Sequence, residues 1–307
     1  MVWIVLPTRN EAPIIRANLE RLLTFLGANI REDWHVTVAD NASTDATRAI
    51  VREIAVREPR VELLEIPEAG KGGAVLVAWQ RALQILDSRF SSQGGSASGG
   101  QIPVYVFMDA DLATDLAALP TLISAIRSGP PSRNAPAREP ADIAVGSRYL
   151  PGAQTERGFL RQCISWCYRK LLQLLFGLRV SDPPCGFKAV NERVVRDIVP
   201  LVRDRQWFFD TELLIRAQAA GSAAMSAPEK HDRVFLEHSK EFWAGASTIG
   251  YQIVEIPVTW HEPRRKGSIR KIAHMIIGDL RAMWRLRLSL RRTARRLPAS
   301  GGKQSRK

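Results

Sequence analysis

Short apolar runs alternate with longer segments of helical periodicity through the first half of the chain. Runs rich in Val, Ile and Phe and bounded by polar or Gly-rich residues predict strands, and apolar residues that recur every three to four positions predict helices. The predicted strands are Val2–Leu6, Val36–Ala39, Val61–Ile66, Val104–Met108 and Ile143–Val145, and the helices between them are Ala12–Leu26, Thr44–Arg57, Gly73–Leu86 and Leu116–Arg127. Such regular alternation predicts an α/β fold with three layers, α/β/α.

The second half of the chain is less regular. Helical periodicity covers 159–175, 211–220 and 272–290, and an apolar run at 252–256 predicts a late strand. Three stretches that lack this periodicity, near 91–101, 129–140 and 222–250, predict loop insertions, and the first two are rich in Gly, Ser and Pro.

The positive charge of the chain is concentrated at its carboxyl end. The chain has 44 Lys or Arg and 31 Asp or Glu, a net charge of +13, and fifteen of the basic residues but a single acid, Asp279, fall within 264–307. A basic tail on a nearly neutral body indicates a local anionic partner, such as lipid headgroups or nucleic acid. We therefore predict one domain over 1–263 and a basic amphipathic extension over 264–307.

Composition excludes several classes of protein. A hydrophobic content of 45% and a charged content of 24% are ordinary for a globular chain and exclude a collagen-like or wholly disordered one. Three cysteines are too few for a disulfide framework and indicate a reducing compartment. No signal segment opens the chain and no apolar run reaches the length of a membrane span, so we expect a cytoplasmic protein or one that lies on a membrane surface.

Polar and Gly-rich residues follow four successive predicted strands. Asp40, Lys71, Asp109 and Asp111 all lie just beyond strand ends, where open α/β sheets bind their ligands. Taken singly, each loop could be a turn or a helix cap. Two carboxylates, a lysine and backbone N–H groups at one sheet edge suit a nucleotide diphosphate held with a divalent cation such as Mg²⁺.

Eight segments in this order resemble a known family. The series PTRNEA, DNASTD, GKGGA, MDADLATD, GSRY, SDPPCGFKA, WFFDTELL and EIPVTW is similar to the family-2 glycosyltransferases of the GT-A fold, and within them to polyprenyl-phosphate (dolichyl-phosphate) glucosyl- and mannosyltransferases. The likeness runs from Val2 to about Lys271. It implies a mixed, mainly parallel sheet and a reaction with a nucleotide-sugar donor.

The resemblance also implies the donor site. It implies Mg²⁺ or Mn²⁺ as the cofactor, with Asp109 and Asp111 as the metal ligands. A third ligand found in some relatives would fall at Ala113, so Thr114, Asp115 or water would have to complete the coordination. The predicted nucleotide-sugar-binding residues are Pro7, Thr8, Asn10, Glu11, Asp40, Asn41, Lys71, Asp109, Ala110 and Asp111.

The same resemblance implies an acceptor site. Arg148 and Lys188 are expected near the acceptor phosphate, which suits guanidinium recognition of phosphate. Asp182 matches a position proposed as the catalytic base in some relatives, although a phosphate acceptor needs little deprotonation, so Asp182 could instead orient Lys188 or the sugar. Asp210 and Glu212 are the alternative candidates, and Asp210 could simply cap a helix.

Two amphipathic segments bear on a lipid acceptor. Residues 159–175 place Leu160, Ile164, Cys167, Leu171 and Leu174 on one helical face, which fits either core packing or lipid contact. The second segment fits a helix that lies in the plane of an anionic membrane surface. Its predicted stripe is Ile272, Ile276, Leu280, Met283 and Leu290, beside Trp284 and the arginines Arg281, Arg285, Arg287 and Arg291.

These observations predict an inverting glycosyltransferase. It would move a hexose, preferably glucose from UDP-glucose, onto a polyprenyl or dolichyl phosphate at the cytosolic face of a membrane. GDP-mannose as the donor and a soluble acceptor stay open as alternatives. A nucleic-acid-associated protein is the alternative from another class, but no nucleic-acid-reading motif is present and no nucleic acid partner is expected.

Overall fold

The computed structural model describes residues 1–92, 102–129, 139–155, 159–226, 250–261 and 269–295. Its centre is a seven-stranded sheet in which all strands run parallel except β7, which is antiparallel to both of its neighbours. In spatial order the strands are β3 (Val61–Ile66), β2 (Trp34–Asn41), β1 (Val2–Thr8), β4 (Val104–Met108), β7 (Phe187–Asn191), β5 (Ile143–Ser147) and β8 (Ile253–Pro257).

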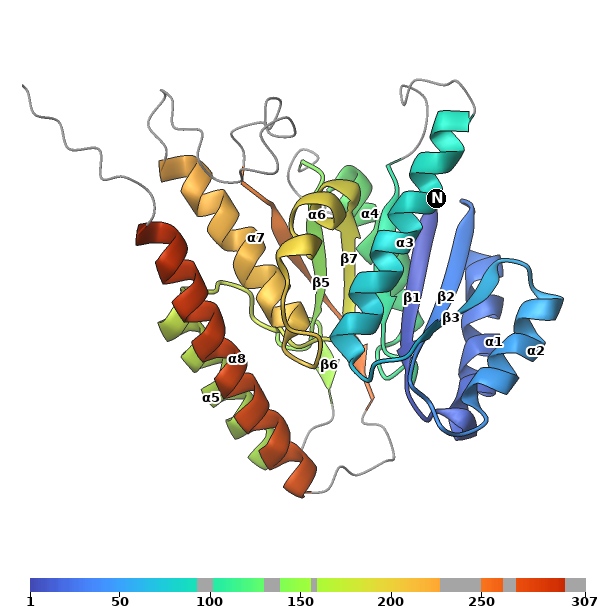
Figure 1. Ribbon diagram of the computed structural model, residues 1–307, viewed down its shortest axis with the longest axis horizontal. Coiled ribbons are helices and arrows are strands. Elements are labelled where there is room, and N and C mark those ends of the chain that lie inside the picture. Colours follow the sequence, from blue (N-terminus) through green and yellow to red (C-terminus); the bar gives the residue numbers. More distant parts are fainter. Residues whose placement is uncertain (93–101, 130–138, 156–158, 227–249, 262–268, 296–307) are drawn as a thin grey trace, which may run out of the picture.

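Helices cover both faces of this sheet, which confirms the predicted three layers and the mainly parallel sheet (Figure 1). One side carries α1 (Ala12–Asn29), α2 (Thr47–Arg57) and α4 (Leu119–Ser128), the last entered through the short 3₁₀ turn η1 (Leu116–Ala118). The other side carries α3 (Lys71–Ser92), α6 (Glu192–Asp197), the 3₁₀ turn η2 (Val199–Leu201) and α7 (Phe209–Ser226).

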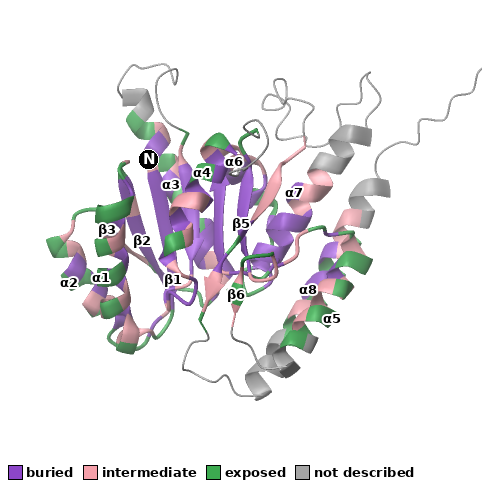
Figure 2. Cartoon of the chain, turned by 180° about the vertical axis from the view of Figure 1, so that it is seen from behind, coloured by how far each residue is buried: buried purple, intermediate pink, exposed green. Residues whose placement is uncertain are grey.

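Two further helices lie side by side beyond α7, namely α5 (Phe159–Phe176) and α8 (Ile269–Arg295) (Figures 1 and 2). Tyr168 of α5 contacts Thr211 of α7, with 3.4 Å between the two hydroxyl oxygens. Arg285 of α8 is ion-paired with Asp204, which precedes α7. A small parallel pair, β6 (Gln154–Thr155) and β9 (Thr259–Trp260), lies apart from the main sheet.

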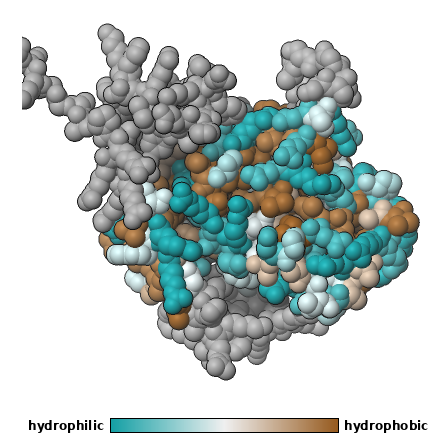
Figure 3. Space-filling view, in the orientation of Figure 1, coloured by the Kyte–Doolittle hydropathy of each residue, from teal (hydrophilic) through white to brown (hydrophobic). Residues whose placement is uncertain are grey.

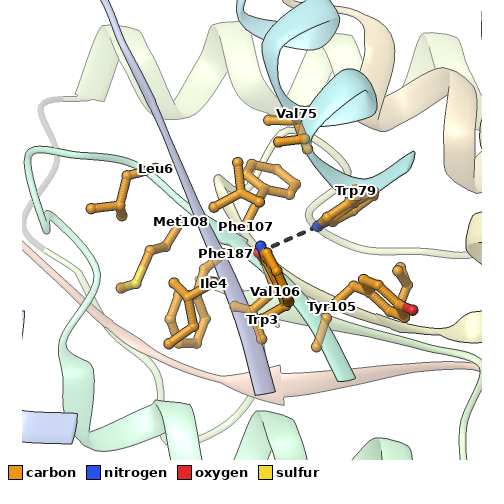
Figure 4. Packing of buried hydrophobic residues seen from close by; sticks show 14 of the residues in the cluster. Trp3, Ile4, Leu6, Val75, Trp79, Tyr105, Val106, Phe107, Met108 and Phe187 are labelled. Carbon is orange, nitrogen blue, oxygen red and sulfur yellow. Dashed lines mark hydrogen bonds between the residues drawn. The ribbon is translucent and has the colours of Figure 1, made fainter. Parts of the chain in front are cut away.

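The sheet is buried on both faces, as expected for parallel strands that carry long apolar runs. Every residue of β1 is buried, and the central strands form the buried interior in Figure 2. From α3, the Trp79 ring packs edge-on against Phe107 of β4, and Trp79 Nε1 donates to the Val106 carbonyl at 3.3 Å (Figure 4). Packing of this kind fixes α3, and therefore its first residue Lys71, relative to the end of β4.

Three local predictions need correction. Residues 222–226, predicted as loop, continue α7, and residues 91–92 close α3. The remainder of the three predicted insertions lies outside the described residues, apart from residues 129, 139–140 and 250. Strand β7 was not predicted, because only five residues separate the preceding turn-rich segment from α6.

The predicted stripe of α8 combined two different faces of the helix. Met283 is buried in the protein core together with Ala282 and Leu286. The exposed apolar face carries Ile276, Ile277, Leu280, Trp284 and Leu288 instead. The described part of the predicted extension therefore packs on the main domain, and its boundary at residue 264 stays a prediction.

Candidate nucleotide-sugar site

The carboxyl ends of β1, β2 and β4 and the amino end of β7 meet at one edge of the sheet. Parallel pairing aligns Thr8 with Asp40, and antiparallel pairing aligns Met108 with Phe187. The segment that precedes β7 therefore lies beside the residues that follow β4. This arrangement brings together the predicted nucleotide residues and the predicted acceptor residues.

Thr8 and Asp40 carry buried oxygens that have no partner within the described chain. Oγ1 of Thr8 and Oδ2 of Asp40 accept and donate no hydrogen bond there. The other Asp40 oxygen, Oδ1, accepts from Arg48 Nε at 2.6 Å and from the Ser43 N–H at 3.1 Å. A buried polar atom without a partner is costly, so two of them on adjacent strand ends indicate a place where a ligand supplies the missing groups.

The loops at this edge are locally strained. Asn10, Ala42 and Leu112 have positive φ values of 57°, 65° and 48°, and they follow β1, β2 and β4 respectively. Non-glycine residues in this region cost energy and are held there by their surroundings, often at functional sites. Asn10 is held by Ser43 Oγ, which accepts from its backbone N–H at 2.9 Å, and by the Thr44 N–H, which donates to its side chain at 2.8 Å.

The other residues predicted for the base and ribose pocket lie along the same edge. Pro7 is the second-last residue of β1, and Glu11 precedes α1 with its N–H bonded to Thr47 Oγ1 at 2.9 Å. The side chain of Asn41 is used inside the protein, because it donates to the Thr8 carbonyl at 2.8 Å and accepts from the Gly70 N–H at 3.2 Å. Asn41 therefore ties the β1 end to the loop that carries Lys71.

Lys71 and Asp109 form an ion pair at this edge of the sheet. Nζ of Lys71 lies 2.5 Å from Oδ1 of Asp109, whose side chain is 42% exposed. Burial alone would lower the pKa of Lys71, but the carboxylates of Asp109, Asp210 and Asp111 outweigh it and raise that pKa above its usual value. Burial and the charge of Asp109 raise the pKa of Asp111. The fixed ammonium group of Lys71 thus lies next to two carboxylates, those of Asp109 and Asp111, which repel each other.

Gly186 is the residue that makes room for this arrangement. A Cβ atom at Gly186 would lie 2.1 Å from Oδ2 of Asp109, far inside van der Waals contact. The Gly186 carbonyl accepts from the Asp109 N–H at 3.1 Å. Gly186 is not among the predicted site residues, although a glycine directly before an apolar run is a recognisable sign of close backbone approach.

The two carboxylates at this site fit a divalent cation whose remaining ligands can come from outside the protein. Asp109 and Asp111 supply hard oxygens, and a bound cation would offset the burial and the repulsion from Asp109 that together raise the pKa of Asp111. In the part of the chain that the structure describes, no three His, Cys, Asp or Glu side chains are grouped to hold a metal. Of the candidates to complete the coordination, Asp115 instead caps η1 by accepting from the Ala117 N–H at 2.9 Å.

His261 is a further candidate ligand that the sequence analysis missed. Its backbone N–H donates to the Ala113 carbonyl at 2.8 Å, and the preceding Trp260 bridges Thr114. These contacts bring an exposed imidazole next to the segment that follows Asp111. Imidazole is the commonest metal ligand among protein side chains, and the histidine directly after a late strand was the available signal.

Arg148 and Asp182 form a second, separate charged unit. Asp182 is 1% exposed, and both of its oxygens accept hydrogen bonds from the Arg148 guanidinium, at 2.6 and 2.7 Å. Ser181, which precedes Asp182, is held by Glu255 of β8 through its N–H and hydroxyl. The guanidinium is therefore fixed in direction at the end of β5, where Arg148 follows Ser147.

Lys188 is not available to an acceptor phosphate, which corrects the prediction. It is 0% exposed, and its Nζ donates to the carbonyls of Pro183 and Cys185 and to Oδ2 of Asp210 at 2.7, 2.5 and 3.2 Å. All three N–H donors are thus used. The residue is the second of β7 and points to the face covered by α7, so it ties the 182–186 segment to that helix.

Asp210 and Glu212 are also engaged inside the protein. Asp210 lies in the first turn of α7 as the partner of Lys188 rather than at a cap position. Glu212 is 4% exposed and binds Arg216 and the Asp204 N–H. Neither carboxylate is free to act as a base on an acceptor. Ala110, predicted at the donor site, is buried, and its carbonyl accepts from Asn18 of α1 at 2.9 Å.

Exposed hydrophobic residues concentrate on the two outer helices. Of the thirteen large hydrophobic residues that are exposed in the described chain, eight lie on α5 and α8. They are Ile164, Trp166 and Leu174 of α5 and Ile276, Ile277, Leu280, Trp284 and Leu288 of α8. Brown hydrophobic residues stand beside teal hydrophilic ones where α8 lies in Figure 3. Among the described helices, none combines the length and apolar composition that crossing a bilayer requires.

Comparisons with known proteins support the sequence resemblance. The model described as glycosyl transferase family 2 matches residues 3–84. Glycosyltransferase AglD of Haloferax volcanii is 30% identical over 302 residues, which cover 96% of this chain and 39% of that protein. Dolichyl-phosphate beta-glucosyltransferase of Saccharomyces cerevisiae is 27% identical over 270 residues, which cover 84% of this chain and 66% of that protein. This chain thus spans less than two thirds of either relative, and relatives named for mannose transfer match as well.

A solved structure shares the fold. Glucosyl-3-phosphoglycerate synthase from Mycobacterium tuberculosis, in complex with Mn²⁺, UDP and glucosyl-3-phosphoglycerate, matches with a TM-score of 0.57 and 16% identity. The match covers 98% of this chain and 82% of that chain. At this identity the likeness concerns the fold, and it extends over nearly the whole of this chain.

Proposed function

We propose that this chain, a family 2 glycosyltransferase of the GT-A fold, transfers a hexose from a nucleotide diphosphate sugar to a polyprenyl phosphate. The observation that carries the proposal is the Lys71–Asp109 ion pair, which lies at the same edge of the sheet as the unpartnered oxygens of Thr8 and Asp40. The Lys71–Asp109 pair suits the charged diphosphate, and the oxygens of Thr8 and Asp40 suit the hydroxyl and N–H groups of a nucleoside. Both lie at the ends of neighbouring strands, β2, β1 and β4, at one edge of the sheet.

The donor is held from its nucleoside to its diphosphate. Asp40 Oδ2 accepts a hydrogen bond from the nucleoside, Thr8 Oγ1 accepts or donates one, and Lys71 neutralises part of the diphosphate charge. Asp109 and Asp111 would hold Mg²⁺ or Mn²⁺, which supplies further charge neutralisation for the leaving diphosphate. Because Lys71 is fixed by Asn41, Gly70 and Asp109 before the donor binds, little reorganisation is needed when charge develops there.

The acceptor phosphate is placed by Arg148. Its guanidinium is oriented by Asp182 and retains further N–H donors for a phosphate oxygen. A phosphate monoester is already anionic, so its oxygen can attack the anomeric carbon without a protein base. The bond from that carbon to the diphosphate oxygen breaks as the new bond forms on the opposite side, which inverts the configuration.

We prefer UDP-glucose as the donor, with GDP-mannose as the alternative. The preference rests on the segments from Cys185 to Lys188 and from Trp207 to Asp210, which are closer to the glucosyl branch of the resemblance. The match to a dolichyl-phosphate beta-glucosyltransferase supports it. The relatives named for mannose transfer keep the alternative open.

A membrane surface is the place where the acceptor would be met. The exposed apolar residues of α5 and α8 lie on helices that also carry exposed Lys170, Arg281 and Arg285. Apolar side chains, two tryptophans and basic residues on adjoining helices suit the headgroup region of an anionic bilayer. We infer peripheral attachment at the cytosolic face, where nucleotide sugars are available.

A donor panel tests the proposed function. Radiolabelled UDP-glucose, GDP-mannose and two further nucleotide sugars would be incubated with Mg²⁺ and a short-chain polyprenyl phosphate in detergent, and label in the organic phase would be counted. We expect one donor, UDP-glucose, to give counts that EDTA abolishes. Transfer only to a soluble acceptor, or with EDTA present, would contradict the proposal.

Vesicle flotation tests the membrane surface. Replacing both Leu280 and Trp284 by Ser should release the full chain from anionic vesicles, because apolar insertion and charge act together. The control replaces the exposed Val56 of α2 by Ser and should float like the wild type. Binding that ignores salt concentration and lipid charge would contradict an anionic partner.

A further inference from the structure

Trp207 is a large aromatic residue displayed at the candidate donor site. It is 57% exposed, and Nζ of Lys71 lies 5.0 Å from the centroid of its ring. Since Lys71 contacts Asp109 at 2.5 Å, the indole borders the space in front of the proposed diphosphate position. Its neighbours in sequence, Phe208 and Phe209, are both buried in the core.

The backbone on either side of Trp207 is fixed rather than loose. The N–H groups of Gly72 and Gly73 donate to the carbonyls of Gln206 and Arg205 at 3.0 and 2.9 Å. The Gln206 side chain returns a bond to the Ala69 carbonyl at 2.9 Å. The segment before α7 and the loop that carries Lys71 are therefore joined into one rigid unit, which holds an apolar ring in water beside a charged site.

Packing within the protein does not account for this ring. A side chain of this size stabilises a fold chiefly through burial, and more than half of the residue's accessible surface stays exposed. Rigid aromatic surfaces at the mouth of a polar site are typical of ligand-binding positions. The ligand must present an apolar face within reach of a diphosphate.

We propose that Trp207 is a donor-binding residue, the wall on which the transferred hexose packs through the C–H groups of one face of its ring. This assignment rests on the proposed function, because the hexose is the part of the donor that is bonded directly to the diphosphate. Trp207 would then select for a sugar nucleotide over the free nucleotide.

The alternative ligand for the ring is the first isoprene unit of the acceptor. The arrangement of charges favours the hexose, because Trp207 lies beside Lys71, whereas the acceptor arginine Arg148 lies 5.6 Å from the ring centroid of Trp260. The two tryptophans therefore mark the donor and the acceptor sides of the reaction centre separately.

Binding measurements with Trp207→Ala, Trp207→Phe and wild type test the assignment. Dissociation constants for UDP and UDP-glucose, or GDP and GDP-mannose, would be measured by calorimetry with Mg²⁺ and no acceptor. We expect Trp207→Ala to weaken binding of the sugar nucleotide about tenfold while binding of the free nucleotide changes less than about twofold, and Trp207→Phe to restore most of the loss. Val56→Ala, which trims an exposed apolar side chain on α2 away from both sites, should change neither.

The outcomes separate this assignment from the proposed function. If wild type binds no sugar nucleotide, the proposed function fails. If wild type binds one and Trp207→Ala binds it equally well, or loses the free nucleotide to the same extent, the hexose assignment is overturned. An unchanged donor affinity with a raised acceptor KM would move Trp207 to the acceptor side.

Discussion

The carboxylate of Asp182 accepts three hydrogen bonds from Arg148, from Nε at 2.6 Å, from Nη2 at 2.7 Å and from the backbone N–H at 2.9 Å. Both oxygens are used, and the residue is 1% exposed. A carboxylate so engaged is poorly placed to take a proton from an acceptor. Of the two roles that the sequence leaves open for Asp182, the structure favours orientation, and the group it orients is Arg148 rather than Lys188.

Asp182→Asn should therefore weaken acceptor binding more than it slows turnover. Losing one charge-assisted contact to Arg148 is expected to raise the acceptor KM about tenfold, with the donor KM within about twofold of wild type. The pH profile should keep its shape. Steady-state kinetics with a short polyprenyl phosphate measure this, and Asp87→Asn, which alters an exposed ion pair with Arg196, is the matched control. A fall in kcat of about 10² with an unchanged acceptor KM would instead indicate a base.

Gly186→Ala should remove activity while leaving the fold largely intact. The new Cβ would meet Oδ2 of Asp109 at 2.1 Å, so the carboxylate must move away from Lys71 and Asp111. We expect loss of Mn²⁺-dependent nucleotide binding by calorimetry and a transfer rate lower by about 10². Gly27→Ala is the control, because a Cβ there has no neighbour within 4 Å and alanine favours the α1 helix. Full activity of Gly186→Ala would contradict the described position of Asp109.

The Lys188–Asp210 pair should behave as a buried structural pair. Lys188→Met leaves the Asp210 carboxylate buried without its partner, which is expected to lower the free energy of unfolding by about 3–5 kcal/mol. The double replacement Lys188→Met and Asp210→Leu should recover part of that loss, because no unpaired charge remains. Urea unfolding of wild type and the two variants measures both effects. A stable Lys188→Met protein with a raised acceptor KM would restore the role in acceptor binding.

Asp279 should make stability depend on pH where α8 packs on α5 and α7. Burial, with the nearby carboxylates of Asp210 and Asp204, raises the pKa of Asp279 to about 7, and a hydrogen bond with Tyr168 opposes the shift. The folded protein thus binds this proton more tightly than the unfolded chain does, so its contribution to stability is present at low pH and is lost as pH rises from about 4 to about 7.

Asp279→Asn should remove that contribution. Relative to wild type, the variant should gain melting temperature above pH 7 and lose the gain as pH falls towards 4. Thermal unfolding at pH 4.5, 6 and 8 measures the difference, and Asp33→Asn, in the loop before β2, controls for removal of an exposed carboxylate. A difference that is constant across these values would show that the Asp279 carboxyl titrates normally.

The sequence predicts the sheet and the donor edge because both are local patterns. Runs such as Val104–Met108 are long and apolar enough to require burial, and the residues that follow them must then share one edge. The role of Lys188 could not be predicted in this way. Its environment depends on β7 running antiparallel next to β4 and on α7 covering that face, and both are contacts between distant segments.

The two faces of α8 also depend on contacts between distant segments, which local sequence patterns do not predict. Periodicity identified an amphipathic helix, but which apolar residues turn inward depends on α5 and α7, so Met283 is buried and Leu288 is exposed. The role of Gly186 could not be predicted for the same reason. Its backbone comes close to Asp109 only when the segment before β7 folds back on the end of β4.

The most direct test of the central claim is the transfer of hexose label to a polyprenyl phosphate by wild type, Lys71→Gln and Lys170→Gln in detergent. Lys170 is an exposed lysine of α5, outside the candidate donor site, and serves as the matched control. If Lys71 meets the donor diphosphate, removing its charge should lower the rate by about 10², whereas Lys170→Gln should transfer label like wild type. Equal rates for wild type and Lys71→Gln, or no transfer by wild type from any nucleotide sugar, would contradict the account.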